Sequence, residues 1–336
     1  MTDALDVARL LLHPRDVTLR EELRGGGNNR LLRLDSAGES LVAKLYFDRD
    51  RLQAEYGFLR YATEELGLRC VPAPVGCDPE QRLGLYRYVE GRPVAAPPSA
   101  AQVRQAAAFF EALNAGSRAA AQGLPTASDG AFTLAGHVEL VERRLERLGA
   151  IPTNEALDRE ARELVAALDG LLAPLVHHLR REAEARRISF DEPLAGEDRC
   201  VSPSDFGFHN ALEVAGGAVV FLDFEYAGWD DPAKAIGDFF CQPLVPVDLR
   251  YLDEVAAAFT AHSGMATTLV ERARILFPLA WFRWCLIRLN EFHPEALRRR
   301  VFADPGLDVD ARKMRQLESA RQAVSELGMV GKWASS

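Results

Sequence analysis

The sequence predicts an α+β fold with two lobes, a small β-rich N-lobe followed by a larger, mainly helical C-lobe. Three observations support this prediction. The first 91 residues contain short apolar segments separated by glycine-containing turns, as antiparallel strands do. From about residue 100 the apolar residues recur with the helical period. Residues 199–226 interrupt that helical pattern with a loop and a short β-ribbon.

The N-lobe is expected to contain short strands and one helix. Residues 17–34 and 39–47 read as short strands around two glycine-containing turns, a glycine-rich loop and the hairpin turn at 35–38. Apolar residues at helical spacing over 51–66 predict a helix that Gly67 ends. Residues 71–78 and 82–91 predict two further strands, and the proline-rich connector that follows places the boundary between an N-lobe, 1–91, and a C-lobe, 92–336.

The C-lobe is expected to be helical on both sides of the ribbon. The ribbon itself consists of 211–214 and 218–223 around the Gly216-Gly217 turn. Helical periodicity predicts helices over 100–115, 136–148, 154–187, 250–262, 267–292 and 309–328.

Composition and charge exclude several classes of protein. Lys and Arg number 40 against 49 Asp and Glu, and the net charge of −9 argues against a protein that coats nucleic acid. With 48% hydrophobic and 26% charged residues the chain is not disordered. The five cysteines include no CxxC pair, which argues against a disulfide framework or a zinc ribbon. No signal peptide and no transmembrane run is evident, so we expect a cytoplasmic protein.

Three oxygen-bearing side chains of the ribbon region can do chemistry. Asp205 and Asn210 lie five positions apart on a loop, and Asp223 ends the second ribbon strand. The hairpin turns all three toward one point. Mg²⁺ is the expected occupant, because it prefers oxygen ligands and is usually held by one or two carboxylates together with substrate phosphates. One carboxylate remains free to take a proton from a hydroxyl.

The segments SPSDFGFHNAL and VVFLDFEYAGWDDP resemble the protein-kinase-like small-molecule phosphotransferases, the aminoglycoside phosphotransferase and choline kinase superfamily. The resemblance spans roughly residues 20–290 and implies a bilobal protein-kinase-like fold. It implies that Asp205 is the catalytic base, that Asn210 and Asp223 bind Mg²⁺, and that Asp238 and the Asp231-Pro232 turn support the loop. The chain departs from the superfamily in carrying Pro203-Ser204 where His-Gly usually precedes the base.

The N-lobe carries a second set of matching residues. Lys44 lies on the strand after the glycine-rich loop and Glu55 lies 11 residues later on the expected helix, as in the kinase ion pair that engages nucleotide phosphates. In the loop, Gly25 to Gly27 allow the backbone to approach phosphate, and Asn28 or Asn29 can donate hydrogen bonds to it. By resemblance, LYRYVEG is the hinge whose Arg87 carbonyl and Val89 amide meet the adenine.

The resemblance implies an enzyme that transfers the γ-phosphoryl group of ATP, with GTP not excluded, to a hydroxyl group of a small metabolite. The FEYAG segment favours an amino alcohol such as choline or ethanolamine, while aminoglycosides and sugars remain open. The residues expected to line the acceptor site are Glu225, Tyr226, Asp230, Trp284 and Glu291. Neither nucleic acid nor a membrane is an expected partner, and the sequence does not disclose the oligomeric state.

Each of these residues also has an ordinary structural interpretation. Aspartate and asparagine are common in turns and caps, a strand-edge lysine is usually solvated, and Trp281 and Trp284 at helical spacing usually fill a core. His209 is expected to pack the loop, because Mg²⁺ seldom recruits imidazole. Two rival functions remain, a non-catalytic nucleotide-binding protein with the same fold and a protein kinase. The second is disfavoured because LDFEYAGWDDP leaves no long activation segment.

Overall fold

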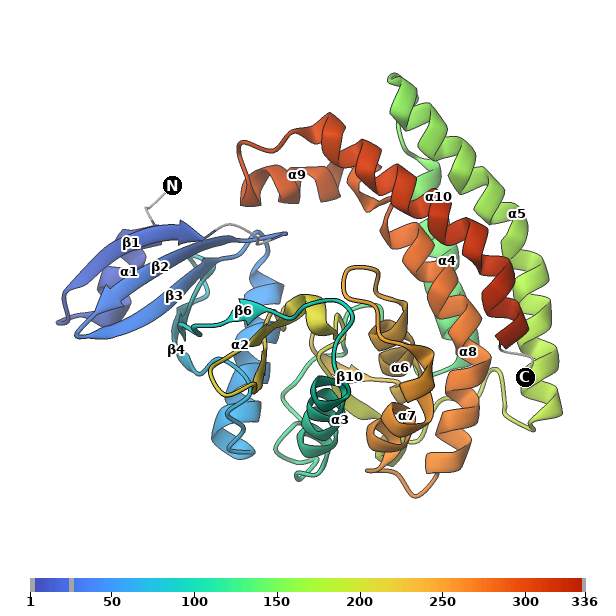
Figure 1. The fold of residues 1–336 in the computed structure, drawn as a ribbon, viewed down its shortest axis with the longest axis horizontal. Helices are drawn as coiled ribbons and strands as arrows, with labels where there is room; N and C mark the ends of the chain where they lie inside the picture. The colour runs from blue at the N-terminus through green and yellow to red at the C-terminus, as the bar shows by residue number, and fades with distance from the viewer. Residues whose placement is uncertain (1–3, 24–26, 334–336) are drawn as a thin grey trace.

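The computed structural model describes residues 4–23 and 27–333. Its N-terminal part is built on a five-stranded antiparallel sheet, of which Figure 1 labels β1, β2, β3 and β4. The strands lie in the order β1-β2-β3-β5-β4. Gly25 and Gly26 of the expected loop lie outside the described residues. The strand bounds are β1 (Val17–Leu23), β2 (Arg30–Ser36), β3 (Glu39–Leu45), β4 (Pro74–Asp78) and β5 (Leu83–Arg87).

Helix α1 (Ala4–Leu12) covers one face of this sheet, and Lys44 of β3 lies on the opposite face. Its Val7 and Leu12 pack in one apolar cluster with residues of β2, β3 and β5, including Leu41 and Ala43. Successive side chains of a strand point to opposite faces, so the residue after Ala43 points away from α1. Strand alternation thus directs the Lys44 amine toward the C-lobe.

Helix α2 (Arg49–Arg60) belongs to the large hydrophobic core rather than to the small cluster under α1. Asp48 caps its N-terminus, and a π-helical turn over Tyr61–Glu65 continues it to the end of the expected helix. Phe58 stacks on Phe224 of the C-lobe with ring centroids 4.6 Å apart. The hydrophobic core therefore runs through both lobes, and α2 carries its residues at a fixed position relative to the ribbon.

The connector at the predicted lobe boundary adds a strand to the C-lobe. Its β6 (Arg92–Pro93) pairs with β8 (Ala211–Glu213), which pairs in turn with β9 (Val219–Phe221). The expected β-ribbon is therefore present, with β6 as a third strand. A separate two-stranded ladder joins β7 (Cys200–Ser202) to β10 (Gly228–Asp230) and closes the loop that contains Asp205.

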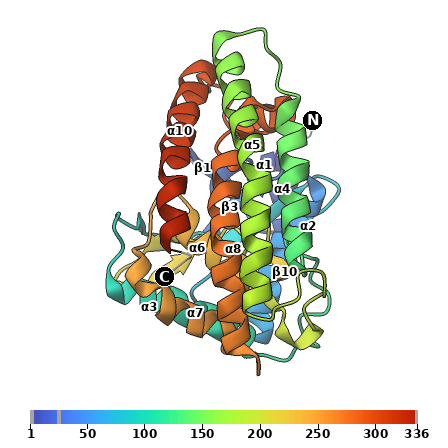
Figure 2. The same cartoon turned by 90° about the vertical axis from the view of Figure 1, so that its right-hand side faces the viewer.

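All the helices that periodicity predicts are present, within a few residues of their expected ends. The C-lobe helices are α3 (Ala100–Asn114), α4 (Leu134–Gly149), α5 (Ala156–Ala185), α6 (Pro232–Cys241), α7 (Leu252–Thr260), α8 (Ala266–Ile287), α9 (Pro294–Ala303) and α10 (Val309–Trp333). Figure 2 shows α4, α5, α8 and α10 side by side.

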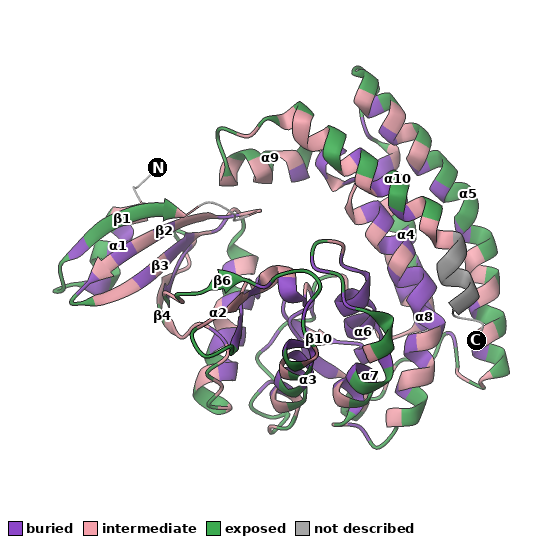
Figure 3. Ribbon diagram, in the orientation of Figure 1, coloured by how far each residue is buried: buried purple, intermediate pink, exposed green. Residues whose placement is uncertain are grey.

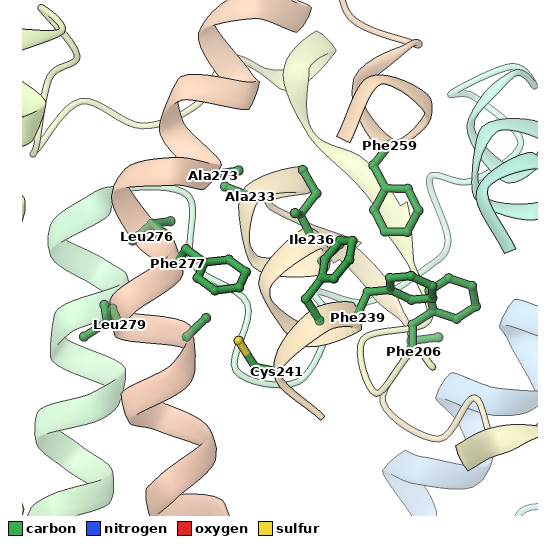
Figure 4. Packing of buried hydrophobic residues seen from close by; sticks show 14 of the residues in the cluster. Phe206, Ala233, Ile236, Phe239, Cys241, Phe259, Ala273, Leu276, Phe277 and Leu279 are labelled. Atoms are coloured by element: carbon green, nitrogen blue, oxygen red, sulfur yellow. The ribbon is translucent and has the colours of Figure 1, made fainter. Parts of the chain in front are cut away.

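Helical periodicity does not reveal α1, α6 or α9. Every residue of α6 is buried, as its continuous purple ribbon in Figure 3 shows, so that helix has no polar face to create a period. Helices α1 and α9, with nine and ten residues, are likewise not among the predicted helices. Around α6, Phe239 packs with Phe206 and Phe259 (Figure 4). None of the helices in the described part of the chain could cross a membrane.

Candidate active site

Asp205 lies on the loop that follows β7, with its carboxylate partly open to solvent. Its side chain is 34% exposed, and Oδ1 lies 3.1 Å from Nε2 of His209. The Asp205 amide donates to the Pro203 carbonyl at 3.0 Å, which makes the turn tight. His209 therefore contacts the carboxylate itself and does more than pack the loop. Asp205 is accessible and orientated, as a residue that accepts a proton from a bound hydroxyl must be.

Ser204 explains how the loop is braced without the usual His-Gly. Its φ of 67° lies in the left-handed region, where glycine is the ordinary residue. Hydrogen bonds hold it there: its amide donates to Ser202 Oγ at 3.0 Å, and its hydroxyl donates to the Ser128 carbonyl at 3.1 Å. Lys234 donates to the same hydroxyl at 2.9 Å. These contacts brace the loop just before Asp205.

Lys234 is the centre of a buried ion cluster behind the loop. Its Nζ lies 2.7 Å from Asp230 and 3.2 Å from Asp238, whose carboxylate also pairs with Arg283. Burial raises the pKa of Asp230 to about 6, although Lys234 opposes this shift. Trp284, which is partly buried, donates to Asp238 at 3.0 Å. Asp230 has no exposed surface, so an acceptor has no direct access to it.

Asp231 supports the neighbouring turn in the way that the resemblance implied. It caps α6 by accepting from the Ala233 amide at 2.9 Å. Its other oxygen lies 2.8 Å from Arg272 Nε and 3.1 Å from His137. Burial alone would raise the pKa of this carboxyl, but Arg272 and His137 together outweigh burial and hold the pKa below its usual range. The turn after β10 is therefore anchored to α4 and α8.

Asn210 and Asp223 are brought together by the ribbon. The Leu222 amide donates to the Asn210 carbonyl at 2.8 Å, so the two candidate metal ligands lie at the same end of the ribbon, Asn210 just before β8 and Asp223 two residues after β9. The Asn210 amide nitrogen donates to the Asp205 carbonyl at 3.0 Å, which leaves its oxygen available. Asp223 has a left-handed φ of 65° and a side chain that is 35% exposed. Strained backbone of this kind is concentrated at functional sites.

This donor set fits Mg²⁺. One Asp223 oxygen contacts Lys44, and its other oxygen and the Asn210 oxygen remain as hard ligands. The described residues contain no group of three or more His, Cys, Asp or Glu side chains that could hold a metal by themselves. Mg²⁺ commonly takes only one or two protein ligands and completes its shell with phosphates and water.

Lys44 meets the ribbon from the opposite lobe. Its Nζ lies 2.6 Å from Glu55 Oε2 and 2.6 Å from Asp223 Oδ1. Tyr46 donates to the same Glu55 oxygen at 2.7 Å and thereby holds the carboxylate in place. Burial would lower the pKa of Lys44, but Asp223 and Glu55 raise it well above its usual value. The amine therefore stays charged, as a contact to phosphate requires.

The described end of the glycine-rich loop, Gly27 to Asn29, is held by side chains of the C-lobe. Arg300 of α9 donates to the Gly27 carbonyl at 2.7 Å and to Asn28 Oδ1 at 3.0 Å. A Cβ at Gly27 would lie 2.5 Å from that guanidinium nitrogen, so a larger residue there would displace the end of the Arg300 side chain. Asn28 and Asn29 each donate to Glu225 at 2.5 Å. Their amide nitrogens are thus occupied by a carboxylate, whereas the sequence suggested that they donate to phosphate.

The remaining acceptor candidates lie at the contact between lobes. Glu225 has no exposed side-chain surface. Glu291 is buried, and one oxygen accepts from Arg300 at 2.8 Å and from Arg312 at 3.0 Å. Tyr226 accepts from Asn28 at 3.0 Å through its hydroxyl. The carboxylates of Glu225 and Glu291 therefore contact arginine and asparagine side chains of the protein itself. Neither carboxylate lines the open acceptor pocket that the sequence suggested.

Asp129 is a candidate residue that sequence reasoning missed. It follows Ser128, whose amide donates to the Tyr226 carbonyl at 3.0 Å and whose carbonyl accepts from Ser204. Its φ is 51° and its partly exposed carboxylate pairs with Arg144. Burial would raise the pKa of Asp129, but Arg144 lowers it below its usual value. Asp129 is recognised as a candidate only from its left-handed backbone next to the loop that contains Asp205. The sequence gives no signal for it.

The expected hinge lies at the end of β5. Arg87 is the last residue of that strand and pairs through its side chain with Glu39 at 2.8 Å. The Tyr88 amide donates to the Ser40 carbonyl at 3.0 Å. Val89 follows, half-buried, just before β6. The Arg87 carbonyl therefore lies at the end of the sheet, and the Val89 amide follows two positions later, where the chain enters the C-lobe.

Comparisons with known proteins identify the fold. The ADP-bound aminoglycoside phosphotransferase APH(2'')-Ib aligns with a TM-score of 0.57 at 13% identity, covering 97% of this chain and 98% of that one. The choline kinase of Cryptosporidium parvum aligns with a TM-score of 0.54 at 12% identity (95% and 94% covered). The choline kinase of Streptococcus pneumoniae aligns with a TM-score of 0.52 at 17% identity (96% and 97% covered). The predicted bilobal kinase-like fold is confirmed.

Sequence comparison gives one result at the level of a family. The sequence profile of the phosphotransferase enzyme family matches residues 20–274. A search of curated proteins gives no significant match. The profile covers the glycine-rich loop, Lys44, the hinge and the ribbon, and it ends within α8.

Proposed function

Because the chain belongs to the phosphotransferase enzyme family, we propose that this small-molecule phosphotransferase takes the γ-phosphoryl group of ATP and transfers it to a hydroxyl group of a small metabolite. The observation that carries the proposal is the contact of Lys44 with Asp223 at 2.6 Å. It brings a phosphate-binding cation of one lobe to the ribbon that also holds Asp205 and Asn210. This is the arrangement that phosphoryl transfer needs, since its catalysis depends on position and charge.

Each group has a role in this proposal. Asp205 accepts the hydroxyl proton of the acceptor as the oxygen attacks the γ-phosphorus, the bond from this phosphorus to the bridging oxygen breaks, and ADP leaves. Lys44, steadied by Glu55, contacts the phosphates and stabilises their charge. Asn210 and Asp223 would hold Mg²⁺, which neutralises phosphate charge when it is bound.

The nucleotide is proposed to lie between the lobes. The main chain at Gly27 borders its phosphates, and the Arg87 carbonyl and Val89 amide meet the base. ATP is the proposed donor, with GTP as the alternative. The five free cysteines suit a reducing cytoplasmic location, where this donor is abundant.

The proposed acceptor is an amino alcohol, an aminoglycoside or a sugar-like alcohol. The structural neighbours named above include two choline kinases and an aminoglycoside phosphotransferase. Within this chain, Asp129 and Tyr226 lie next to the catalytic loop and are our candidates to border the acceptor. Trp284 stays a weaker candidate, because its indole nitrogen is used by Asp238.

The test is a panel assay of ATP consumption with amino alcohols, aminoglycosides and sugars as acceptors. We expect one class to be phosphorylated and Asp205→Asn to lose about 100-fold or more of the turnover, since general-base contributions are of that order. Unchanged turnover in this variant would refute the assigned base. Nucleotide binding without phosphorylation of any acceptor would favour the alternative, a non-catalytic nucleotide-binding regulatory protein.

A further inference from the structure

Glu225 collects three hydrogen-bond donors from the N-lobe. Arg51 at the start of α2 donates to Oε1 at 2.7 Å. Asn28 donates to the same oxygen and Asn29 donates to Oε2, both at 2.5 Å. All three donors lie at least 174 positions earlier in the chain. One carboxylate therefore joins the glycine-rich loop and helix α2 to the C-lobe.

The burial of this carboxylate makes its energy depend on closure of the lobes. Its side chain has no exposed surface, and a buried charge is tolerated only when it is paired and hydrogen-bonded. The three side chains that donate to Glu225 all belong to the N-lobe. Separation of the lobes would therefore expose the Glu225 carboxylate to water without these partners. Tyr226 strengthens the same contact, because the Arg51 guanidinium lies over its ring at 4.3 Å.

Glu225 and Asp223 have different environments although they are only two positions apart. Asp223 is 35% exposed and contacts Lys44, the residue proposed to contact phosphate. When nucleotide and Mg²⁺ bind, the contact between Lys44 and Asp223 would be replaced by contacts of Lys44 with phosphate and of Asp223 with Mg²⁺. Both oxygens of Glu225 are already engaged by amides and a guanidinium, so its contacts can persist through the exchange.

We propose that Glu225 is a positioning residue that holds the glycine-rich loop and α2 against the ribbon during phosphoryl transfer, and that it is not a metal ligand. The proposal rests on the proposed function for the identity of the nucleotide site. It predicts that loss of the Glu225 charge weakens nucleotide binding and leaves the Mg²⁺ requirement unchanged. A metal ligand at this position predicts the opposite.

The experiment compares Glu225→Gln with the wild-type chain and with Glu64→Gln, a matched change in an exposed ion pair. The dissociation constant of a non-hydrolysable ATP analogue is measured first, because it needs no acceptor. We expect Glu225→Gln to raise it about tenfold, since hydrogen bonds to a charged group are worth about that much. The Mg²⁺ concentration for half-maximal analogue binding should change less than about twofold, because the Glu225 oxygens contact Asn28, Asn29 and Arg51 and not the proposed metal ligands Asn210 and Asp223.

A double-mutant cycle with Arg51 separates positioning from a general loss of stability. Arg51→Met should weaken analogue binding about as much as Glu225→Gln, and the double variant should be little worse than either, because the two changes remove one shared contact. Arg51→Lys should restore part of the affinity. Additive losses would overturn the proposal, and so would a Mg²⁺ requirement raised tenfold or more.

A third variant covers the case in which Glu225→Gln fails to fold. Asn28→Ala removes one donor from the loop and leaves the carboxylate paired with Arg51. It should raise the dissociation constant of the analogue by a smaller factor, and unchanged affinity would overturn the proposal. If instead the wild-type chain binds the analogue but phosphorylates no acceptor in the panel, the proposed function fails while the role of Glu225 in closure is still decided by these binding data.

Discussion

The Nζ atom of Lys44 lies 2.6 Å from Oδ1 of Asp223, although the two residues are 179 positions apart in the sequence. The same amine contacts Glu55, which is buried. Lys44 therefore both stabilises a buried carboxylate and supplies charge to the proposed phosphate site. These two roles can be separated by mutation.

Lys44→Met should abolish most of the activity and also destabilise the chain. It removes a cation that stabilises phosphate charge, for which a loss of about 100-fold or more in turnover is expected. It also leaves Glu55 buried without its cation, which costs about 3–5 kcal/mol of unfolding free energy. The double variant with Glu55→Gln should regain stability in urea denaturation without regaining turnover. Recovery of both together would contradict the assignment to phosphate.

Asp129→Asn should affect the acceptor and spare the nucleotide. The residue lies beside the catalytic loop with a partly exposed carboxylate. Loss of one charged hydrogen bond to the acceptor should raise its KM about tenfold. The dissociation constant of the ATP analogue should stay the same. Asp169→Asn, an exposed change on α5, serves as the control. Equal KM values for these two variants would remove Asp129 from the acceptor site.

Lys234→Met should destabilise the chain more than any surface change. The substitution leaves Asp230 and Asp238 buried without their shared lysine and removes the hydrogen bond to Ser204. Breaking a buried ion pair from one side typically costs about 3–5 kcal/mol. Arg60→Met breaks an exposed pair with Glu64 and should cost at most about 1 kcal/mol. Urea denaturation measures both, and similar midpoints would show that the cluster contributes little.

Stability should fall as the pH is lowered from about 7.5 to 6. Burial lowers the pKa of His137 and His262 below the value of about 6.5 for an unfolded histidine. On acidification the unfolded chain therefore binds protons before the folded chain does, which favours unfolding. Below pH 6 the trend should weaken, because Asp230, with a pKa of about 6, binds its proton in the folded state first.

The variant His137→Gln tests the source of this pH dependence. Asp231 lies 3.1 Å from the imidazole, and the nearby cations Arg272 and Arg283 oppose its protonation. A glutamine can keep a hydrogen bond to Asp231 but binds no proton. The urea midpoint of this variant should therefore vary less between pH 7.5 and 6 than that of the wild type. An equal slope would assign the effect to other groups.

The sequence determined those features that depend on short stretches of chain. A tight hairpin suffices to bring Asn210 and Asp223 to the same end of the ribbon, and the observed hydrogen bond between Leu222 and Asn210 agrees. A strand followed by a helix brings Lys44 and Glu55 together across 11 positions. Such local geometry is encoded by periodicity and turn residues, so it can be predicted without knowledge of the packing.

Only the tertiary structure decided which polar groups are free to act. Asp230 and Glu225 are acidic residues near the catalytic loop in sequence, yet packing buries the first against Lys234 and the second against Arg51. Arg300 reaches the glycine-rich loop from 273 positions away, and no local pattern predicts that contact. The availability of a charge depends on which distant groups neutralise it and on how much water the packing excludes, and both are properties of the folded chain as a whole.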